Sequence, residues 1–148
     1  SMKNDFNNIF FVCSMIEYVS RITQNKRGAV VRALGIEGIR KQLSDAEVNH
    51  CLTFDQVAEE WINWYNISDG DFDSVADCKY DVPDYMAIGK LYAYIVTDVQ
   101  ENNTVEETIM NFFSSFLSDL ISNFNSDFYC QNPEYLECCY KEGKVLWD

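Results

Sequence analysis

Residues 5–23 read DFNNIFFVCSMIEYVSRIT, and this stretch decides the fold. Apolar residues recur in it at spacings of three and four, which is the period of one face of an α-helix. Phe11, Val12 and Met15 widen that face beyond a single stripe. We therefore predict a helix over residues 5–24 that lies at the centre of the molecule. The recurring positions are Phe6, Ile9, Phe10, Cys13, Ile16, Val19 and Ile22.

Capping motifs mark where three more long helices begin. In a capping box, a Ser or Thr and a Glu or Gln three residues later bond each other's free backbone N–H groups. A single Asp can also accept these N–H groups. The predicted helices are residues 54–65 after a box at Thr53–Gln56, residues 104–124 after a box at Thr104–Glu107, and residues 84–99 after Asp84.

Shorter helices are expected between residues 26 and 51. Asn25 can cap one that Gly35 would stop, and residues 36–43 form another. A third capping box, Ser44–Glu47, predicts one more helix start in this region.

The helical period weakens after Asn125. Pro133 can start a short helix that ends near Cys139, and we expect residues 125–148 to be a weakly structured or partner-binding tail. Two prolines and six glycines are few for a turn-rich β protein, whereas a 47% apolar content is ample for one core. The sequence therefore predicts one all-α domain over residues 1–148, a bundle of four main helices with short helices between them.

Charge is distributed unevenly along the chain. Residues 1–43 hold seven basic and three acidic residues, whereas residues 44–139 hold two basic and nineteen acidic ones, within a total net charge of −13. Such a field repels nucleic acid and anionic membranes and attracts cationic surfaces. We expect a basic protein partner and neither nucleic acid nor membrane. The early basic residues could form a nucleic-acid patch, but they fit better as counter-charges to the acidic half, within the fold or across a homodimer.

Residues 66–83, NISDGDFDSVADCKYDVP, predict a long acidic loop. Loops longer than about 12–15 residues are uncommon in compact domains and are often functional. Carboxylates on such a loop would contact a basic partner, and aromatic side chains among them would anchor it. The predicted partner-binding residues are Asp69, Asp71, Phe72, Asp73, Asp77, Tyr80 and Asp81.

The same carboxylates leave a second interpretation open, a metal-binding hydrolase that uses the cluster from Asp69 to Asp84. Asp69, Asp71 and Asp73 have the alternating spacing that opens a calcium loop. The rest of that pattern fails, because Ser74 replaces the turn glycine and Tyr80 replaces the bidentate Glu.

Histidine and cysteine residues give no catalytic or metal-binding signature. His50 is the only histidine and precedes Cys51, but neighbours along a helix do not face each other as a nucleophile and a base must. Cys130, Cys138 and Cys139 could join either residue around zinc, although their spacing differs from the usual ligand pairs. We therefore expect no catalytic residue, no metal and no cofactor.

The chain shows neither an apolar stretch long enough to span a bilayer nor a signal-peptide pattern. We expect a bacterial, cytoplasmic protein whose six cysteines are reduced thiols.

A set of spaced positions between residues 6 and 62 carries a resemblance to a known family. The positions are Phe10, Cys13, Ile16, Glu17, Tyr18, Val30, Val31, Gly38, Leu43, His50 and Ile62. They resemble a bacterial domain-of-unknown-function family of small helical proteins that tend to be encoded beside ADP-ribosyltransferase-like toxins. The chain departs from the family pattern at Arg27–Gly28, where members have Ser-Gly. The resemblance implies a binding role beside a toxin and supplies no catalytic residues.

The sequence thus favours a non-enzymatic protein-binding module, antitoxin- or immunity-like, that neutralises a basic protein partner such as a toxin. The hydrolase is one alternative. A structural homo-oligomer is another, joined through the aromatic tail at residues 128–147 or the Phe-rich helix at residues 104–124.

Overall fold

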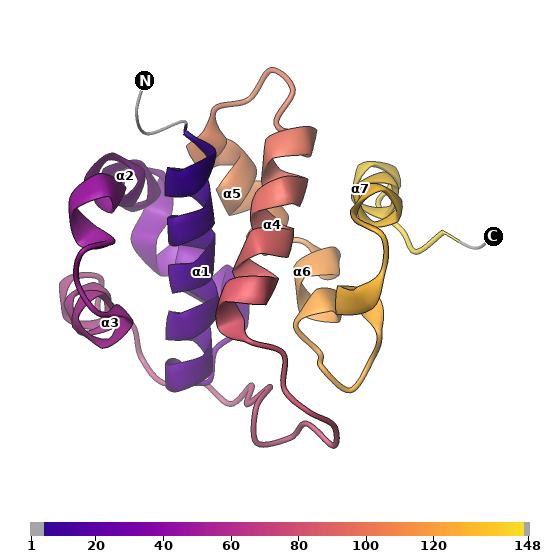
Figure 1. Ribbon diagram of the computed structural model, residues 1–148, viewed down its shortest axis with the longest axis horizontal. Helices are drawn as coiled ribbons and strands as arrows, with labels where there is room; N and C mark the ends of the chain where they lie inside the picture. The colour runs from indigo at the N-terminus through magenta and orange to yellow at the C-terminus, as the bar shows by residue number, and fades with distance from the viewer. Residues whose placement is uncertain (1–4, 147–148) are drawn as a thin grey trace.

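α1 (Phe6–Thr23) runs through the middle of a helical bundle in a computed structural model that describes residues 5–146 (Figure 1). All regular structure in this range is helical, which confirms the predicted all-α domain. The other elements are α2 (Arg27–Asn49), α3 (Phe54–Trp64), α4 (Tyr85–Val99), α5 (Val105–Phe113), α6 (Phe116–Ile121), the 3-10 helix η2 (Phe128–Cys130) and α7 (Pro133–Glu142).

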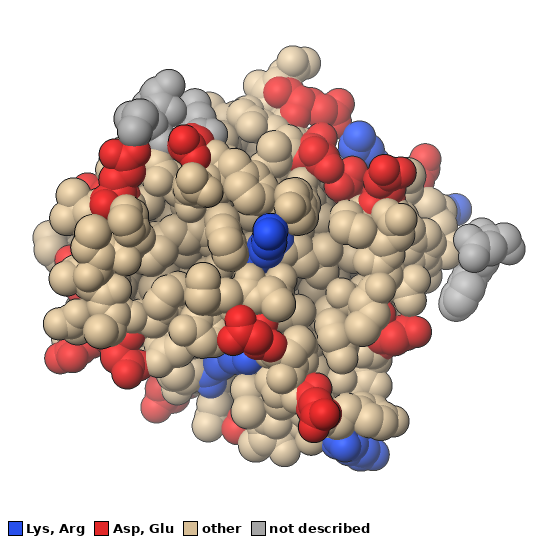
Figure 2. Space-filling view, viewed as in Figure 1, with Lys and Arg blue, Asp and Glu red and all other residues tan. Residues whose placement is uncertain are grey.

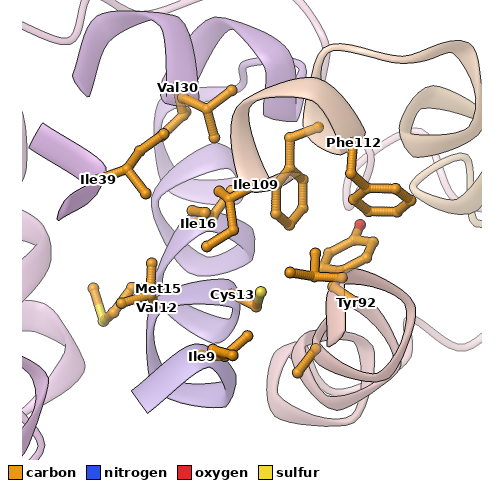
Figure 3. Packing of buried hydrophobic residues seen from close by; sticks show 14 of the residues in the cluster. Ile9, Val12, Cys13, Met15, Ile16, Val30, Ile39, Tyr92, Ile109 and Phe112 are labelled. Atoms are coloured by element: carbon orange, nitrogen blue, oxygen red, sulfur yellow. The ribbon is translucent and has the colours of Figure 1, made fainter. Parts of the chain in front are cut away.

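The central position predicted for the first helix is confirmed. α1 packs against α2, α3 and α4, and its side chains at Val12, Ile16 and Val19 are fully buried. Figure 3 shows this side of α1 meeting apolar side chains from α2, α4 and α5. The helix begins where Asp5 accepts the backbone N–H of Asn7 at 2.7 Å. It ends at Gln24, whose backbone is left-handed.

Both capping boxes that open long helices are confirmed. The hydroxyl of Thr53 accepts the N–H of Gln56 at 3.1 Å, and the Gln56 side chain accepts the N–H of Thr53 at 2.9 Å. Thr104 and Glu107 make the same reciprocal bonds at the start of α5. Asp84 accepts the first free N–H groups of α4. The sequence located these helix starts because each signal is contained within four residues.

The region predicted as several short helices is α2, which consists of two helical segments that meet at Gly35, so the predicted stop at Gly35 is confirmed. The backbone of Gly35 is non-helical, with a φ of 71° and a ψ of 171°. The second segment runs on to Asn49, so its predicted end at residue 43 is wrong. Ser44 lies inside α2 and starts nothing, because Leu43 and Ala46 are fully buried on its inner face and hold the helix continuous past the box.

The residue that caps α2 also differs from the prediction. Lys26 occupies the cap position and makes no side-chain bond there. The side chain of Asn25 instead donates to the carbonyl oxygen of Ser68 in the long loop, at 2.8 Å.

The helix predicted over residues 104–124 is two helices, α5 and α6. Ser115 has an extended backbone between them, and its hydroxyl donates to the carbonyl oxygen of Phe112 at 2.6 Å. The change of direction lets Phe112 and Phe113 pack on Tyr92 of α4, with ring centroids 5.8 and 4.8 Å away. These rings are fully buried, so they belong to the core.

The tail after residue 125 is more ordered than its sequence pattern suggests. Asn132 caps α7 and Gly143 ends it at a positive φ of 73°, so this helix extends past the predicted end at Cys139. α7 packs on α4 and α6, where Leu136 and Cys139 are fully buried. Residues 147–148 of the predicted tail lie outside the described range.

Candidate functional site

Residues 66–83 form the predicted non-helical loop, which we name the acidic loop, between α3 and α4 at the lower end of the bundle (Figure 1). Its first half crosses the end of α1. The N–H of Gly70 donates to the carbonyl oxygen of Thr23 at 2.8 Å, and that of Phe72 donates to Gln24 at 2.8 Å. A Cβ atom at residue 70 would lie 2.7 Å from the Gln24 carbonyl oxygen, so this approach requires glycine.

The second half of the acidic loop is held by the segment after α6. The side chain of Asn125 accepts the N–H of Lys79 at 2.7 Å and donates to the carbonyl oxygen of Asp77 at 2.9 Å. The Cys78 thiol donates to the carbonyl oxygen of Phe124 at 3.6 Å. Both halves of the loop are therefore fixed to the bundle through its backbone.

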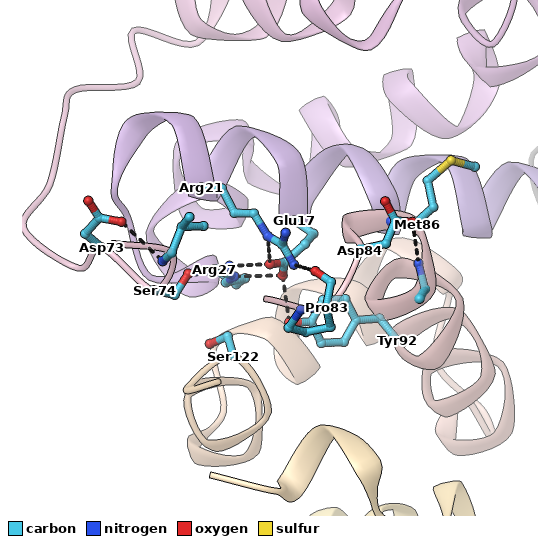
Figure 4. A network of polar contacts seen from close by, with 12 residues as sticks. Glu17, Arg21, Arg27, Asp73, Ser74, Pro83, Asp84, Met86, Tyr92 and Ser122 are labelled. Atoms are coloured by element: carbon cyan, nitrogen blue, oxygen red, sulfur yellow. Dashed lines mark hydrogen bonds and ion pairs between the residues drawn. The ribbon is translucent and has the colours of Figure 1, made fainter. Parts of the chain in front are cut away.

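A buried ion network lies behind the acidic loop, centred on Glu17 of α1 (Figure 4). Arg27 donates to both oxygens of the Glu17 carboxylate, Arg21 donates to one at 2.7 Å, and the Tyr92 hydroxyl donates to the other at 2.9 Å. Glu17 and Arg27 are 0% exposed. Two cations on one carboxylate leave a net positive charge in this buried corner.

The two arginines of this network also bind the acidic loop directly. Arg27 donates to the Ser74 hydroxyl at 3.2 Å, and its guanidinium lies 5.9 Å from the centre of the Phe72 ring. Arg21 donates to the carbonyl oxygen of Pro83 at 2.8 Å. The network thus ties the middle and the end of the loop to α1 and α2.

Electrostatics of the network follow from burial and pairing. Burial alone would raise the pKa of Glu17, but the charges and hydrogen bonds of Arg27 and Arg21 outweigh it and hold the pKa of this carboxyl below its usual value. Burial, together with the Glu17 charge, raises the pKa of Tyr92 well above its usual value. The charged pair and the neutral phenol are therefore the stable forms at neutral pH.

The structure divides the predicted partner-binding residues into two groups. Phe72 packs beside Arg27, and Asp73 accepts the backbone N–H groups of Val75 and Ala76, so both help to shape the loop. Tyr80 projects outward with 68% of its surface exposed. Among residues 5–146, no ion pair involves the carboxylates that are exposed with it, which are Asp69, Asp71, Asp77 and Asp81.

Five basic residues of the first 43 are paired within the fold, and three of them pair with carboxylates of residues 44–139, as predicted. Arg40 joins α2 to α5 through Glu106 at 2.6 Å, and it also pairs with Glu37. These ion pairs neutralise positive charge that the sequence alone does not show to be paired. The other pairs are Arg21 and Arg27 with Glu17, Lys41 with Asp45, and Lys26 with Asp119.

The candidate metal-binding residues do not converge, whereas the candidate nucleophile pair does. Within residues 5–146, no group of three or more His, Cys, Asp or Glu side chains is arranged to hold a metal ion. His50 ends α2, and its Nδ1 lies 3.8 Å from the Cys51 sulfur, so these neighbours do meet where the helix stops, contrary to the prediction. Both are exposed. All six cysteines are free thiols, and burial raises the pKa of Cys13.

A second surface feature was missed by the sequence analysis, a hollow of about 520 Å³ that we name the aromatic groove. It lies along α1 between the end of α2, the start of α3 and the start of α4. The helical period of residues 5–23 assigns these rings to a core-facing helix but does not say which of them another helix covers. Its lining includes Phe10, Phe11, Glu47, His50, Phe54 and Met86.

Comparison of the chain with protein-family models, with curated proteins and with solved structures finds no match. No helix within residues 5–146 is both long and apolar enough to cross a membrane.

Proposed function

We propose that this protein is a non-enzymatic binding module that neutralises a basic protein partner through the acidic loop. One observation carries the proposal: the loop combines exposed, unpaired carboxylates with a backbone that is fixed at both halves. The residues proposed to contact the partner are Asp69, Asp71, Asp77, Tyr80 and Asp81.

Fixation of the backbone favours binding because little further ordering is needed when a partner arrives. Flexible loops lose conformational entropy on association, whereas a loop already held by Asn25, Arg27 and Asn125 loses less. Unpaired carboxylates on one loop also speed encounter with a cationic surface by electrostatic steering. Tyr80 supplies the kind of aromatic side chain that anchors interfaces.

An antitoxin- or immunity-like role is the specific form of this proposal. The resemblance over residues 6–62 supports it, because that family is associated with toxins. The net charge of −13 supports it further, since it suits a protein that covers a basic surface.

The test compares two variants with equal changes of charge. The loop variant carries Asp69→Asn, Asp71→Asn, Asp77→Asn and Asp81→Asn. The control carries Glu59→Gln, Glu60→Gln, Glu101→Gln and Glu142→Gln, all exposed and outside the loop.

Affinity capture at low salt, read by mass spectrometry, identifies the partner, and stopped-flow mixing then measures its association rate against salt. We expect the loop variant to associate more slowly and with a flatter salt dependence, and the control to resemble the wild type. Equal effects of the two variants would show that net charge matters and that the loop does not.

A further inference from the structure

The part of α1 that other helices leave partly exposed carries aromatic side chains, where a surface helix normally carries polar ones. Phe10, Phe11 and Tyr18 are all half-buried on this stripe. Their rings belong to two clusters, and each cluster contributes rings to the lining of the aromatic groove. Phe6 contacts Phe10 and Tyr94, with centroids 6.4 and 5.2 Å away. The second cluster contains Phe11, Tyr18, Phe54 and Tyr85.

The face that contains α1 and α4 is mostly uncharged. Figure 2 shows one basic side chain at its centre and acidic side chains just below it, with most of the other carboxylates toward the edges. Met86 and Tyr94 of α4 are 41% and 44% exposed on the same side of the bundle as these rings. Large apolar surfaces with a polar rim mark interaction sites on soluble proteins, and aromatic residues and Met are enriched in them.

We infer that the aromatic groove binds an amphipathic basic helix of the protein partner. This inference rests on the proposed function and adds a second contact surface to it. The apolar face of the helix lies on the rings, and its Lys and Arg side chains reach the rim carboxylates of Asp5 and Glu47, which line the same groove.

The dimensions of the face suit such a helix. The ring-bearing stretch of α1 runs from Phe6 to Tyr18, which at 1.5 Å per residue is roughly 18 Å, or about three turns of a helix lying beside it. Apolar anchors at i, i+3, i+4 and i+7 of the bound helix would meet rings along this length. The flexible side chain of Met86 can adapt to anchors of different shape.

Charge favours this occupant over a second copy of the chain or a membrane. Two copies joined through this face would bring their carboxylate rims together, and like charges at an interface repel. An anionic bilayer would be repelled for the same reason. The groove and the acidic loop are also neighbours along the chain, because Met86 lies in the first turn of α4, three residues after the loop ends at Pro83. One basic partner can therefore contact both surfaces.

The probe for the test is a labelled synthetic helical peptide of about three turns, with Leu on one face and Lys on the other. A peptide with Glu in place of each Lys is the charge control. The groove variant is Met86→Lys. The matched control is Trp64→Lys, which makes the same change of charge at an exposed apolar position that lies outside both the groove and the acidic loop. Urea unfolding checks that both variants are folded.

We expect fluorescence anisotropy to show saturable binding of the Lys peptide, weakened about tenfold or more by the groove variant and little by the control. NMR shifts should map to Phe10, Phe54 and Met86, and should persist in the loop variant. Shifts confined to residues 66–83 would overturn the groove inference and leave the proposed function standing. Equal binding of the Glu peptide, binding to anionic vesicles, or self-association abolished by the groove variant would also overturn it.

Discussion

Carboxylates serve opposite purposes in two adjoining regions of this molecule. Glu17 is fully buried and accepts hydrogen bonds from Arg27, Arg21 and Tyr92, whereas the exposed carboxylates of the acidic loop have no ion-pair partner among residues 5–146. A buried charge is tolerated only with partners, so it constrains the fold. An exposed charge stays solvated and adds to the field around the protein. The first region positions the second, because the arginines that neutralise Glu17 also hold the loop.

The largest expected effect comes from breaking the buried network. Arg27→Met removes the main partner of a fully buried carboxylate and should lower the free energy of unfolding by about 3–5 kcal/mol. Urea unfolding measures the loss. Lys41→Met, which breaks an exposed pair with Asp45, should cost no more than about 1 kcal/mol. Similar losses in the two variants would contradict the distinction between buried and exposed charge.

The next largest effect comes from separating the loop from α1 without touching a charge. Gly70→Ala places a Cβ atom 2.3 Å from the Asn25 side chain and 2.7 Å from a backbone oxygen, so the loop must shift. We expect a loss of about 1–3 kcal/mol and faster hydrogen exchange at the Phe72 amide. Val75→Ala, at an exposed position of the same loop, is the control. Unchanged exchange at Phe72 would mean that the loop is not held there.

A third prediction concerns Glu137 of α7, whose carboxyl lies near Asp98 of α4. Unlike Glu17, this carboxyl has no pair of arginines beside it, so it shows what burial does to a carboxyl without strong cation partners. Burial, followed by a hydrogen bond with Asp98, raises the pKa of Glu137 to about 7, and Lys141 only partly opposes the negative charges of Asp98 and Glu134. A carboxyl with a raised pKa binds its proton more tightly in the folded state. Stability should therefore fall as the pH rises from 4.5, its usual pKa, toward 7.

The variant Glu137→Gln should flatten this fall, because glutamine cannot ionise. Thermal unfolding between about pH 5 and about pH 8 measures the slope. Glu142→Gln, at an exposed position on the same helix that does not act on Glu137, should keep the wild-type slope. Glu17 has the opposite sign, since its lowered pKa contributes stability above its usual range that is lost only as the pH falls through the folded-state value.

The smallest effect on stability is expected in the acidic loop itself. The four-residue loop variant described above should change the free energy of unfolding by no more than about 0.5 kcal/mol per site, because these side chains are exposed and unpaired. Asp73→Ala should cost more than any of them, since it removes the acceptor for two backbone N–H groups. Urea unfolding of each variant provides the ranking, and a large loss at the exposed sites would indicate structural roles.

Whether a capping box in the sequence starts a helix in the structure depends on the burial of the residues around it. The boxes at Thr53 and Thr104 start helices as predicted, whereas the equally regular box at Ser44 lies within α2. Burial of Leu43 and Ala46 overrides the local signal at Ser44. The segment between α5 and α6 shows the reverse case, because here the apolar pattern is continuous but the helix breaks. The break at Ser114 and Ser115 allows the ring of Phe113 to pack on Tyr92.

The candidate site was predictable in part. The length and acidity of residues 66–83 are visible in the sequence, and so is the excess of carboxylates over cations. Phe72 and Asp73 were assigned to the partner surface, and both are half-buried, because Phe72 packs beside Arg27 and Asp73 accepts the loop's own backbone N–H groups. Ser74 meets Arg27 from a position 47 residues away in the chain, a distance no local pattern can span.

By itself, the sequence determined the all-α class, the starts of the capped helices, the existence of a long acidic loop and the net charge, since each depends on neighbouring residues or on composition. The tertiary structure alone decided which charges are buried together and which rings remain at the surface. The period of apolar residues in the sequence identifies the apolar face of a helix, but only packing against other helices decides how much of that face is covered. On α1, Glu17 is fully covered by other elements, whereas the rings that line the aromatic groove are covered only in part.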